Sequence, residues 1–175
     1  MTMSDYPFVS VIIPAKNEER FVGDCLDAIA KLDYPRNYYE VIFVDNNSTD
    51  GTLKIVEEKA DENSNLKIVV SSAVTIAGVR MDGFVVAKGD VVGFLDGDCI
   101  VPANWLKHGI AILNSYQDIS CVGFSVSPPD EAAPWVEKTW HIMSSGSRWS
   151  GTRQVPWLSS FNLLVKRNFF ERVGG

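Results

Sequence analysis

Several features that define common protein classes are missing from this 175-residue sequence. Positive charge is scarce: 16 Lys and Arg stand against 22 Asp and Glu, and the net charge of −6 argues against nucleic-acid binding. No apolar run approaches the roughly 20 residues that span a bilayer, and the N-terminus lacks a signal-peptide pattern. The three cysteines are too few and too widely spaced for a disulfide framework, so we expect a cytoplasmic protein.

Glycine-rich phosphate-binding loops are also missing. No Gly-x-Gly-x-x-Gly follows the first predicted strand, which argues against a dinucleotide-dependent oxidoreductase, and no P-loop is present. What the chain does contain is ordinary for one globular domain, with 46% hydrophobic and 22% charged residues.

Predicted strands and helices alternate along the chain. Runs of apolar residues predict strands over residues 8–13, 39–44, 66–70, 91–95, 119–126 and 160–165. Helical spacing predicts helices over residues 18–31, 52–60, 77–87, 102–115 and 168–173, the fourth with Pro102 in its first turn. This alternation predicts an α/β protein with a doubly wound, mostly parallel sheet and helices on both faces. Ligands of such sheets bind outside the carboxyl ends of the strands.

The segment Asp96-Gly97-Asp98 ends a buried strand and places two carboxylates on a loop at that edge. Carboxylate oxygens so placed can hold a hard divalent cation, which in turn binds phosphate oxygens. An acidic turn is the alternative, because Asp and Gly are common turn residues. Two further loops, residues 15–18 and 45–47, bring amides and carboxylates to the same predicted edge and favour the cation site.

Three other groups of residues leave two interpretations open. Ser48, Thr49 or Asp50 can cap the following helix, whereas Asp45 directly at the strand end can accept a hydrogen bond from a ring N–H of a ligand. Arg80 either pairs with Asp82 on the surface or faces a nucleotide. Trp135, Trp140, Trp149 and Trp157 form either a small aromatic core or the wall of an acceptor site.

Taken together, these motifs resemble the GT-A nucleotide-sugar glycosyltransferases of the inverting family 2. The resemblance rests on four blocks in the same order: residues 9–19 (VSVIIPAKNEE), 41–52 (VIFVDNNSTDGT), 94–98 (FLDGD) and 159–175. Any one block is weakly specific, but the series is highly specific and spans almost the whole chain.

The resemblance implies a role for each matching residue. It places Pro14, Ala15, Asn17, Glu18, Asp45, Arg80 and Asp96 around the nucleotide, with Asp45 on the base, most naturally uracil. It also implies that Asp98, together with Asp96, holds Mn²⁺ or Mg²⁺ on the diphosphate, where the metal acts as a Lewis acid. One departure is Met81, where family members usually carry Asn after the arginine.

The family pattern normally continues beyond Gly174-Gly175 to the carboxylate that serves as catalytic base. We therefore expect an N-terminal portion of one GT-A domain, truncated at its C-terminus, with a catalytic base beyond Gly175. Residues 1–100 would form the nucleotide and metal part, and residues 101–175 the start of the acceptor part. A base within the chain would be Asp130, Glu131 or Glu137.

The expected function is metal-dependent transfer of a sugar from a nucleotide-diphosphate sugar to a glycan, lipid or polysaccharide acceptor, with inversion. Expected partners are the donor and a glycan or lipid-linked acceptor, at the cytoplasmic face of a membrane or in the cytoplasm; a homo-oligomer is left open. The alternative is a truncated, inert nucleotide-sugar-binding module. A nucleotidyltransferase is a third interpretation, which normally needs a glycine-rich first loop that residues 14–17 do not supply.

Overall fold

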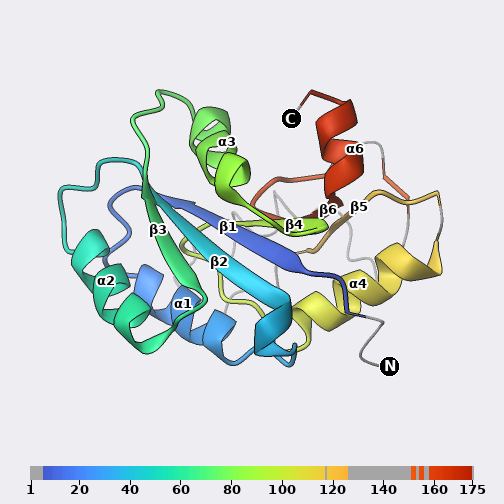
Figure 1. Ribbon diagram of the computed structural model, residues 1–175, viewed down its shortest axis with the longest axis horizontal. Helices are drawn as coiled ribbons and strands as arrows, with labels where there is room; N and C mark the ends of the chain where they lie inside the picture. The colour runs from blue at the N-terminus through green and yellow to red at the C-terminus, as the bar shows by residue number, and fades with distance from the viewer. Residues whose placement is uncertain (1–5, 117, 126–150, 153, 156–157, 175) are drawn as a thin grey trace, which may run out of the picture.

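The computed structural model describes residues 6–116, 118–125, 151–152, 154–155 and 158–174, and these residues form a mixed α/β layer structure (Figure 1). The six-stranded sheet has the order β3-β2-β1-β4-β6-β5. Its strands are β1 (Val9–Ala15), β2 (Tyr39–Asp45), β3 (Leu66–Val70), β4 (Val91–Leu95), β5 (Cys121–Gly123) and β6 (Asn162–Lys166). Strands β1 to β4 run parallel, whereas β6 is antiparallel to both β4 and β5. The predicted α/β class and mostly parallel sheet are confirmed.

The central strands are buried on both faces because helices cover both sides of the sheet (Figure 1). Helices α1 (Val22–Ala30), α2 (Thr52–Glu62) and α4 (Trp105–Ser115) contribute to the larger apolar core on one face. Helices α3 (Ile76–Val86) and α6 (Arg167–Arg172) contribute to a second core on the other face. A short 3₁₀ helix, η2 (Arg36–Tyr38), leads into β2.

Several predicted boundaries are wrong by a few residues. Helix α1 begins at Val22 instead of residue 18, because residues 18–21 form a turn in which the Phe21 amide donates to the Glu18 carbonyl. Pro102 lies before α4, which begins at Trp105. Within the described part of the strand predicted over residues 119–126, which ends at residue 125, only Cys121–Gly123 pair with β6 and form β5.

The amino-end edge of the sheet is held together by a buried polar network around Ser10 and Glu40. The Ser10 hydroxyl donates to Glu40 Oε1 at 2.7 Å, and Lys67 Nζ lies 2.6 Å from Glu40 Oε2. The backbone amide of Lys88 donates to Glu40 Oε1, and that of Gly89 donates to Ser10 Oγ. This network fixes the connection between α3 and β4 against β1 and β2.

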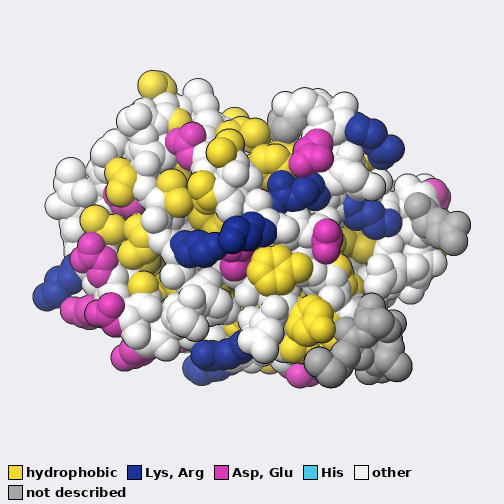
Figure 2. Space-filling view, in the orientation of Figure 1, with side chains coloured by type: hydrophobic (Ala, Val, Ile, Leu, Met, Phe, Trp, Pro, Cys, Tyr) yellow, Lys and Arg dark blue, Asp and Glu magenta, His cyan; other side chains and the backbone are white. Residues whose placement is uncertain are grey.

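Hydrophobic side chains reach the surface on the face that carries β3 and α3 (Figure 2). The exposed residues of this region are Val70, Val74, Ile76, Val85 and Val86.

No helix within the described parts of the chain is long and apolar enough to cross a membrane.

Candidate functional site

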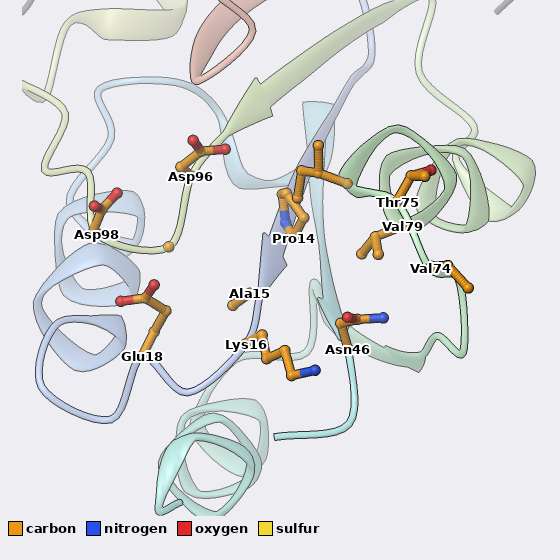
Figure 3. Close-up of a pocket in the computed structure, with 12 residues that line it drawn as sticks. Pro14, Ala15, Lys16, Glu18, Asn46, Val74, Thr75, Val79, Asp96 and Asp98 are labelled. Atoms are coloured by element: carbon orange, nitrogen blue, oxygen red, sulfur yellow. The ribbon is translucent and has the colours of Figure 1, made fainter. Parts of the chain in front are cut away.

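A cavity of about 330 Å³ opens at the carboxyl ends of β1, β2 and β4, where a doubly wound sheet is expected to bind its ligand. Figure 3 shows the side chains that line it. The lining residues are Pro14, Ala15, Lys16, Glu18, Asn46, Val74, Thr75, Ile76, Val79, Asp96, Gly97 and Asp98. Five of the predicted site residues, Pro14, Ala15, Glu18, Asp96 and Asp98, are among them.

One side of the cavity is acidic, with the carboxylates of Glu18, Asp96 and Asp98 gathered there (Figure 3). Partial burial raises the pKa of Glu18, and the charges of Asp98, Asp50 and Asp96 raise it further. The pKa of Asp96 is raised as well. Burial and the charge of Asp98 raise it, and they outweigh the hydrogen bond and the charge of Arg80, which lower it. Mutual repulsion of this kind is relieved when a cation binds between the carboxylates.

Arg80 on α3 forms an ion pair with Asp96, with 2.6 Å between Nη2 and Oδ1. The Arg80 side chain is only 13% exposed, so it does not have the solvated position of the first interpretation. The pairing with Asp82 is wrong, because Asp82 Oδ2 instead accepts a hydrogen bond from the Ser71 hydroxyl. Arg80 does not line the cavity itself and reaches it through Asp96.

The acidic side has the ligand chemistry of a hard divalent cation, because its donors are carboxylate oxygens. Within the described ranges, no group of three or more acidic, histidine or cysteine side chains is arranged to hold a metal by itself. Asp96 and Asp98 supply two carboxylates to the cavity, and this number fits an ion of the Mg²⁺ type, which usually takes one or two carboxylates and completes its shell with waters and substrate phosphates. Asp98 and Asp96 are the residues that would hold it.

The opposite side of the cavity carries the apolar side chains of Val74 and Val79, next to the polar Asn46 and Thr75 (Figure 3). The apolar residues that line the cavity are Pro14, Ala15, Val74, Ile76 and Val79. Val79 is 2% exposed and anchors this side in the core, whereas Val74 is fully exposed at the cavity rim. Apolar side chains opposite a charged half suit a ligand with a planar ring at one end and phosphates at the other.

The loop after β1 is joined to the loop after β2 by hydrogen bonds of Asn17. Asn17 has a left-handed backbone with φ 58°, which Asn tolerates better than most residues. Its side-chain Oδ1 accepts from the backbone amide of Thr49 at 2.8 Å, and its backbone amide donates to Ser48 Oγ at 3.0 Å. Asn17 does not line the cavity, so its predicted contact with a nucleotide stays a prediction.

The same two loops are joined at the start of α2. Asp50 Oδ1 accepts from the Thr52 amide at 3.0 Å, as predicted for a capping residue. Glu19 Oε2 accepts from the Gly51 amide at 2.7 Å, and the Glu18 amide donates to Thr52 Oγ1 at 2.8 Å. Glu18 is therefore held toward the cavity by contacts that come from a segment more than thirty residues away.

Asp45 is 2% exposed and does not line the cavity. Its Oδ2 accepts from the Ser48 amide at 3.1 Å, and its Oδ1 is buried without a hydrogen-bond partner among the described residues. The predicted contact between Asp45 and a base stays a prediction. The next residue, Asn46, lines the cavity instead.

Three further polar residues that line the cavity were not predicted as site residues: Lys16, Asn46 and Thr75. Their positions in the sequence could have indicated them. Lys16 directly follows β1, Asn46 directly follows β2, and Thr75 caps α3 by accepting from the Gly78 amide. The base candidates Asp130, Glu131 and Glu137, and Trp135, Trp140, Trp149 and Trp157, lie outside the described residues.

Comparison with known proteins finds similarity to glycosyltransferases. Glycosyltransferase AglE of Haloferax volcanii is 38% identical over 112 residues, which cover 63% of this chain and 37% of that protein. The structure of mannosyltransferase PcManGT from Pyrobaculum calidifontis, in complex with GDP-Man and Mn²⁺, has a TM-score of 0.77 and 27% identity. That likeness covers 97% of this chain and 47% of PcManGT.

TarS of Staphylococcus aureus (residues 1–349, with UDP-GlcNAc) has a TM-score of 0.64 and 28% identity, over 73% of this chain and 36% of TarS. The chain thus spans less than half the length of these relatives. Residues 10–174 match the family model described as Glycosyl transferase family 2. With this match over nearly the whole chain, and with its GT-A arrangement of strands and helices, the protein belongs to glycosyl transferase family 2.

Proposed function

We propose that this chain carries the donor site of an inverting glycosyltransferase that moves a sugar from a nucleoside diphosphate sugar to a hydroxyl group. The observation that carries the proposal is the division of one cavity into an apolar side and an acidic side at the carboxyl ends of parallel strands (Figure 3). The base of the donor packs against Pro14, Val74 and Val79, and its diphosphate faces Asp96 and Asp98.

A divalent cation, Mn²⁺ or Mg²⁺, completes the proposed site. Asp98 holds it, with Asp96 as the second carboxylate, and Arg80 keeps Asp96 in place through the ion pair at 2.6 Å. When bound, such a cation stabilises the negative charge of the departing nucleoside diphosphate. Glu18 adds a third negative charge beside the cation, which strengthens the attraction without requiring direct coordination.

Two relatives support this donor class. PcManGT was solved with GDP-Man and Mn²⁺, and TarS with UDP-GlcNAc. Both ligands are nucleoside diphosphate sugars, with guanine in one and uracil in the other. We therefore propose a GDP- or UDP-sugar as donor, and a glycan or lipid hydroxyl as acceptor. A carboxylate base removes the acceptor proton while the hydroxyl attacks the anomeric carbon from the opposite side.

Release of nucleoside diphosphate tests the proposal. The protein is incubated with a panel of GDP- and UDP-sugars, Mn²⁺ and glycan or glycolipid acceptors, and the released GDP or UDP is measured. We expect release from at least one donor, its loss with chelator, and a decrease of about 10²-fold or more in Asp98→Asn. Tight donor binding without release from any donor would instead identify a nucleotide-sugar-binding module.

A further inference from the structure

The backbone of Asp96 is held by a strand that comes from a distant part of the chain. Asp96 directly follows β4 (Figure 3), and its amide donates to the Phe161 carbonyl at 3.0 Å. This bond continues the antiparallel pairing of β4 with β6 by one residue beyond the pair Leu95 and Asn162. The Asp96 carbonyl accepts from the Cys99 amide at 3.0 Å. The position of Asp96 therefore depends on where β6 begins, in addition to the ion pair of its side chain.

Asn162, the first residue of β6, is held by its side chain and by its carbonyl group. The Trp105 indole N–H donates to Asn162 Oδ1 at 2.8 Å, and the Phe124 amide donates to the Asn162 carbonyl at 3.2 Å. The indole nitrogen can only donate, so it fixes which way the side-chain amide of Asn162 points. The ends of an element open more easily than its middle. These two bonds therefore hold the end of β6 next to Phe161, the residue that accepts from Asp96.

Trp105 on α4 connects the start of β6 to β4. Its side chain lies in the core, with 2% of the residue exposed. The indole packs against β4 at Gly93, where an added Cβ would lie only 3.2 Å from Trp105 Cη2. Trp105 thus contacts β4 through its ring and β6 through its N–H. A buried N–H is costly to leave unpaired, so the bond to Asn162 keeps the start of β6 beside the end of β4.

We propose that Asn162 is a positioning residue for the cation of the donor site. It holds Phe161 where its carbonyl fixes the backbone of Asp96, and the chain direction set there presents Asp96 and Asp98 to the cation. Arg80 orients the side chain of Asp96, so Arg80 and Asn162 act on different parts of the same residue. This inference rests on the proposed function, because it needs a cation at the two carboxylates.

The cation gain, defined as the ratio of nucleotide affinity with Mn²⁺ to nucleotide affinity with chelator, measures this role. Calorimetry with UDP and with GDP gives the cation gain of the unaltered protein and of each variant. The affinity in chelator reports on the rest of the nucleotide site. A general weakening of that site therefore lowers both affinities and leaves the ratio unchanged. Every titration is run at a temperature at which circular dichroism shows the variant to be folded.

Asn162→Leu keeps the size of the side chain but removes the acceptor. We expect the cation gain to fall about tenfold, the lower end of the roughly 10–100-fold cost of losing an outer partner of a metal ligand. Trp105→Phe removes the donor and should lower the cation gain similarly. The double variant should lower it no further, because both changes remove the same hydrogen bond. If Asn162→Leu does not fold, Asn162→Ala takes its place, since it leaves room for a water at the indole N–H.

Glu40→Gln is the matched control for lost stability. Glu40 is buried at the opposite edge of the sheet and accepts hydrogen bonds from Ser10 and Lys67. Its substitution weakens a buried polar network far from the two carboxylates, as Asn162→Leu weakens one close to them. The cation gain of Glu40→Gln should equal that of the unaltered protein.

Three outcomes would overturn the inference and leave the donor site intact. The first is an unchanged cation gain in Asn162→Leu and Trp105→Phe. The second is a loss of the same size in Glu40→Gln, which would make the effect one of stability alone. The third is an equal loss of affinity with Mn²⁺ and with chelator. A cation gain of 1 in the unaltered protein would instead overturn the cation site of the proposed function, together with the inference that depends on it.

Discussion

Arg80 and Asp96 join helix α3 to the end of strand β4, with 2.6 Å between Nη2 of one and Oδ1 of the other. This contact uses one oxygen of Asp96 and leaves the second available to the cavity that Asp96 lines. Charge-assisted hydrogen bonds of this type are shorter and stronger than neutral ones and fix the geometry of both partners. Arg80 thus determines how Asp96 is presented to a ligand.

A double-mutant cycle on Arg80 and Asp96 should show strong coupling. Arg80→Met leaves the half-buried Asp96 carboxylate without its partner, and we expect a loss of about 1.5–3 kcal/mol in the free energy of unfolding. Adding Asp96→Asn should recover part of that loss. Urea denaturation of the two single variants and the double variant measures it. Additive effects would contradict the pairing, because coupling is the signature of groups in contact.

The acidic side of the cavity should lower the stability of the metal-free protein. Burial and the charges of Asp98, Asp50 and Asp96 raise the pKa of Glu18 in the folded state. The folded protein therefore holds this proton more tightly than the unfolded chain, and stability falls as the pH rises from the ordinary range of a carboxyl through the raised pKa.

Glu18→Gln should remove that penalty. Without metal at neutral pH, we expect its melting temperature to rise by about 1–3 °C, and at a pH below the ordinary carboxyl range the gain should vanish. Scanning calorimetry at the two pH values measures the difference, and Glu58→Gln, exposed on α2, is the control. A lower melting temperature for Glu18→Gln at neutral pH would show that Glu18 stabilises the fold instead.

Glu40, at the opposite edge of the sheet, should have the reverse pH dependence. Burial acts to raise its pKa, but hydrogen bonds from Lys67, Ser10 and the Lys88 amide outweigh burial, and the pKa is lowered. A lowered carboxyl pKa contributes stability above the unfolded value, and this contribution is lost as the pH falls through the folded value.

Glu40→Gln should therefore cost about 1–3 kcal/mol at neutral pH, because buried donors lose a charged acceptor. The difference from the unaltered protein should shrink as the pH falls below about 4. Urea denaturation at several pH values measures this, again with Glu58→Gln for comparison. A difference that stays constant with pH would mean that the charge of Glu40 is not what stabilises the network.

Asp45 makes a prediction for base recognition, because its Oδ1 is buried without a hydrogen-bond partner among the described residues. If this oxygen accepts the ring N–H of uracil, as the position of Asp45 at the strand end first indicated, Asp45→Asn should reduce the UDP/CDP affinity ratio about ten- to a hundredfold. An unchanged ratio in Asp45→Asn would show that Asp45 does not contact the base. Calorimetry with the two nucleotides distinguishes the two outcomes.

Most of the fold could be predicted from the sequence, because β1, β2 and β4 are continuous apolar runs that only a two-sided sheet buries. The start of α1 could not be predicted. Its first turn depends on contacts such as Glu18 with Thr52, which arise only when the loops after β1 and β2 meet. Helical periodicity contains no information about such distant partners.

The sequence predicted the place of the charged residues, because Asp96 and Asp98 directly follow a buried strand, and both line the cavity. It contained less information where side-chain direction decides. Asp45 and Asn46 are consecutive residues at the end of a strand, where successive side chains point to opposite sides, and only Asn46 lines the cavity. Likewise Arg80 and Asp82 are two apart on a helix and face different directions, so the partner of Arg80 comes from β4.

Nucleotide binding with and without metal tests the donor site most directly. UDP and GDP are titrated calorimetrically into the protein with Mn²⁺ and with chelator, and into the variants Asp98→Asn and Asp61→Asn, the latter an exposed residue on α2. We predict tighter binding with Mn²⁺, loss of most of that gain in Asp98→Asn, and no change in Asp61→Asn. Equal affinity with chelator and with Mn²⁺ would contradict the assignment of Asp98 and Asp96 as the residues that hold the cation.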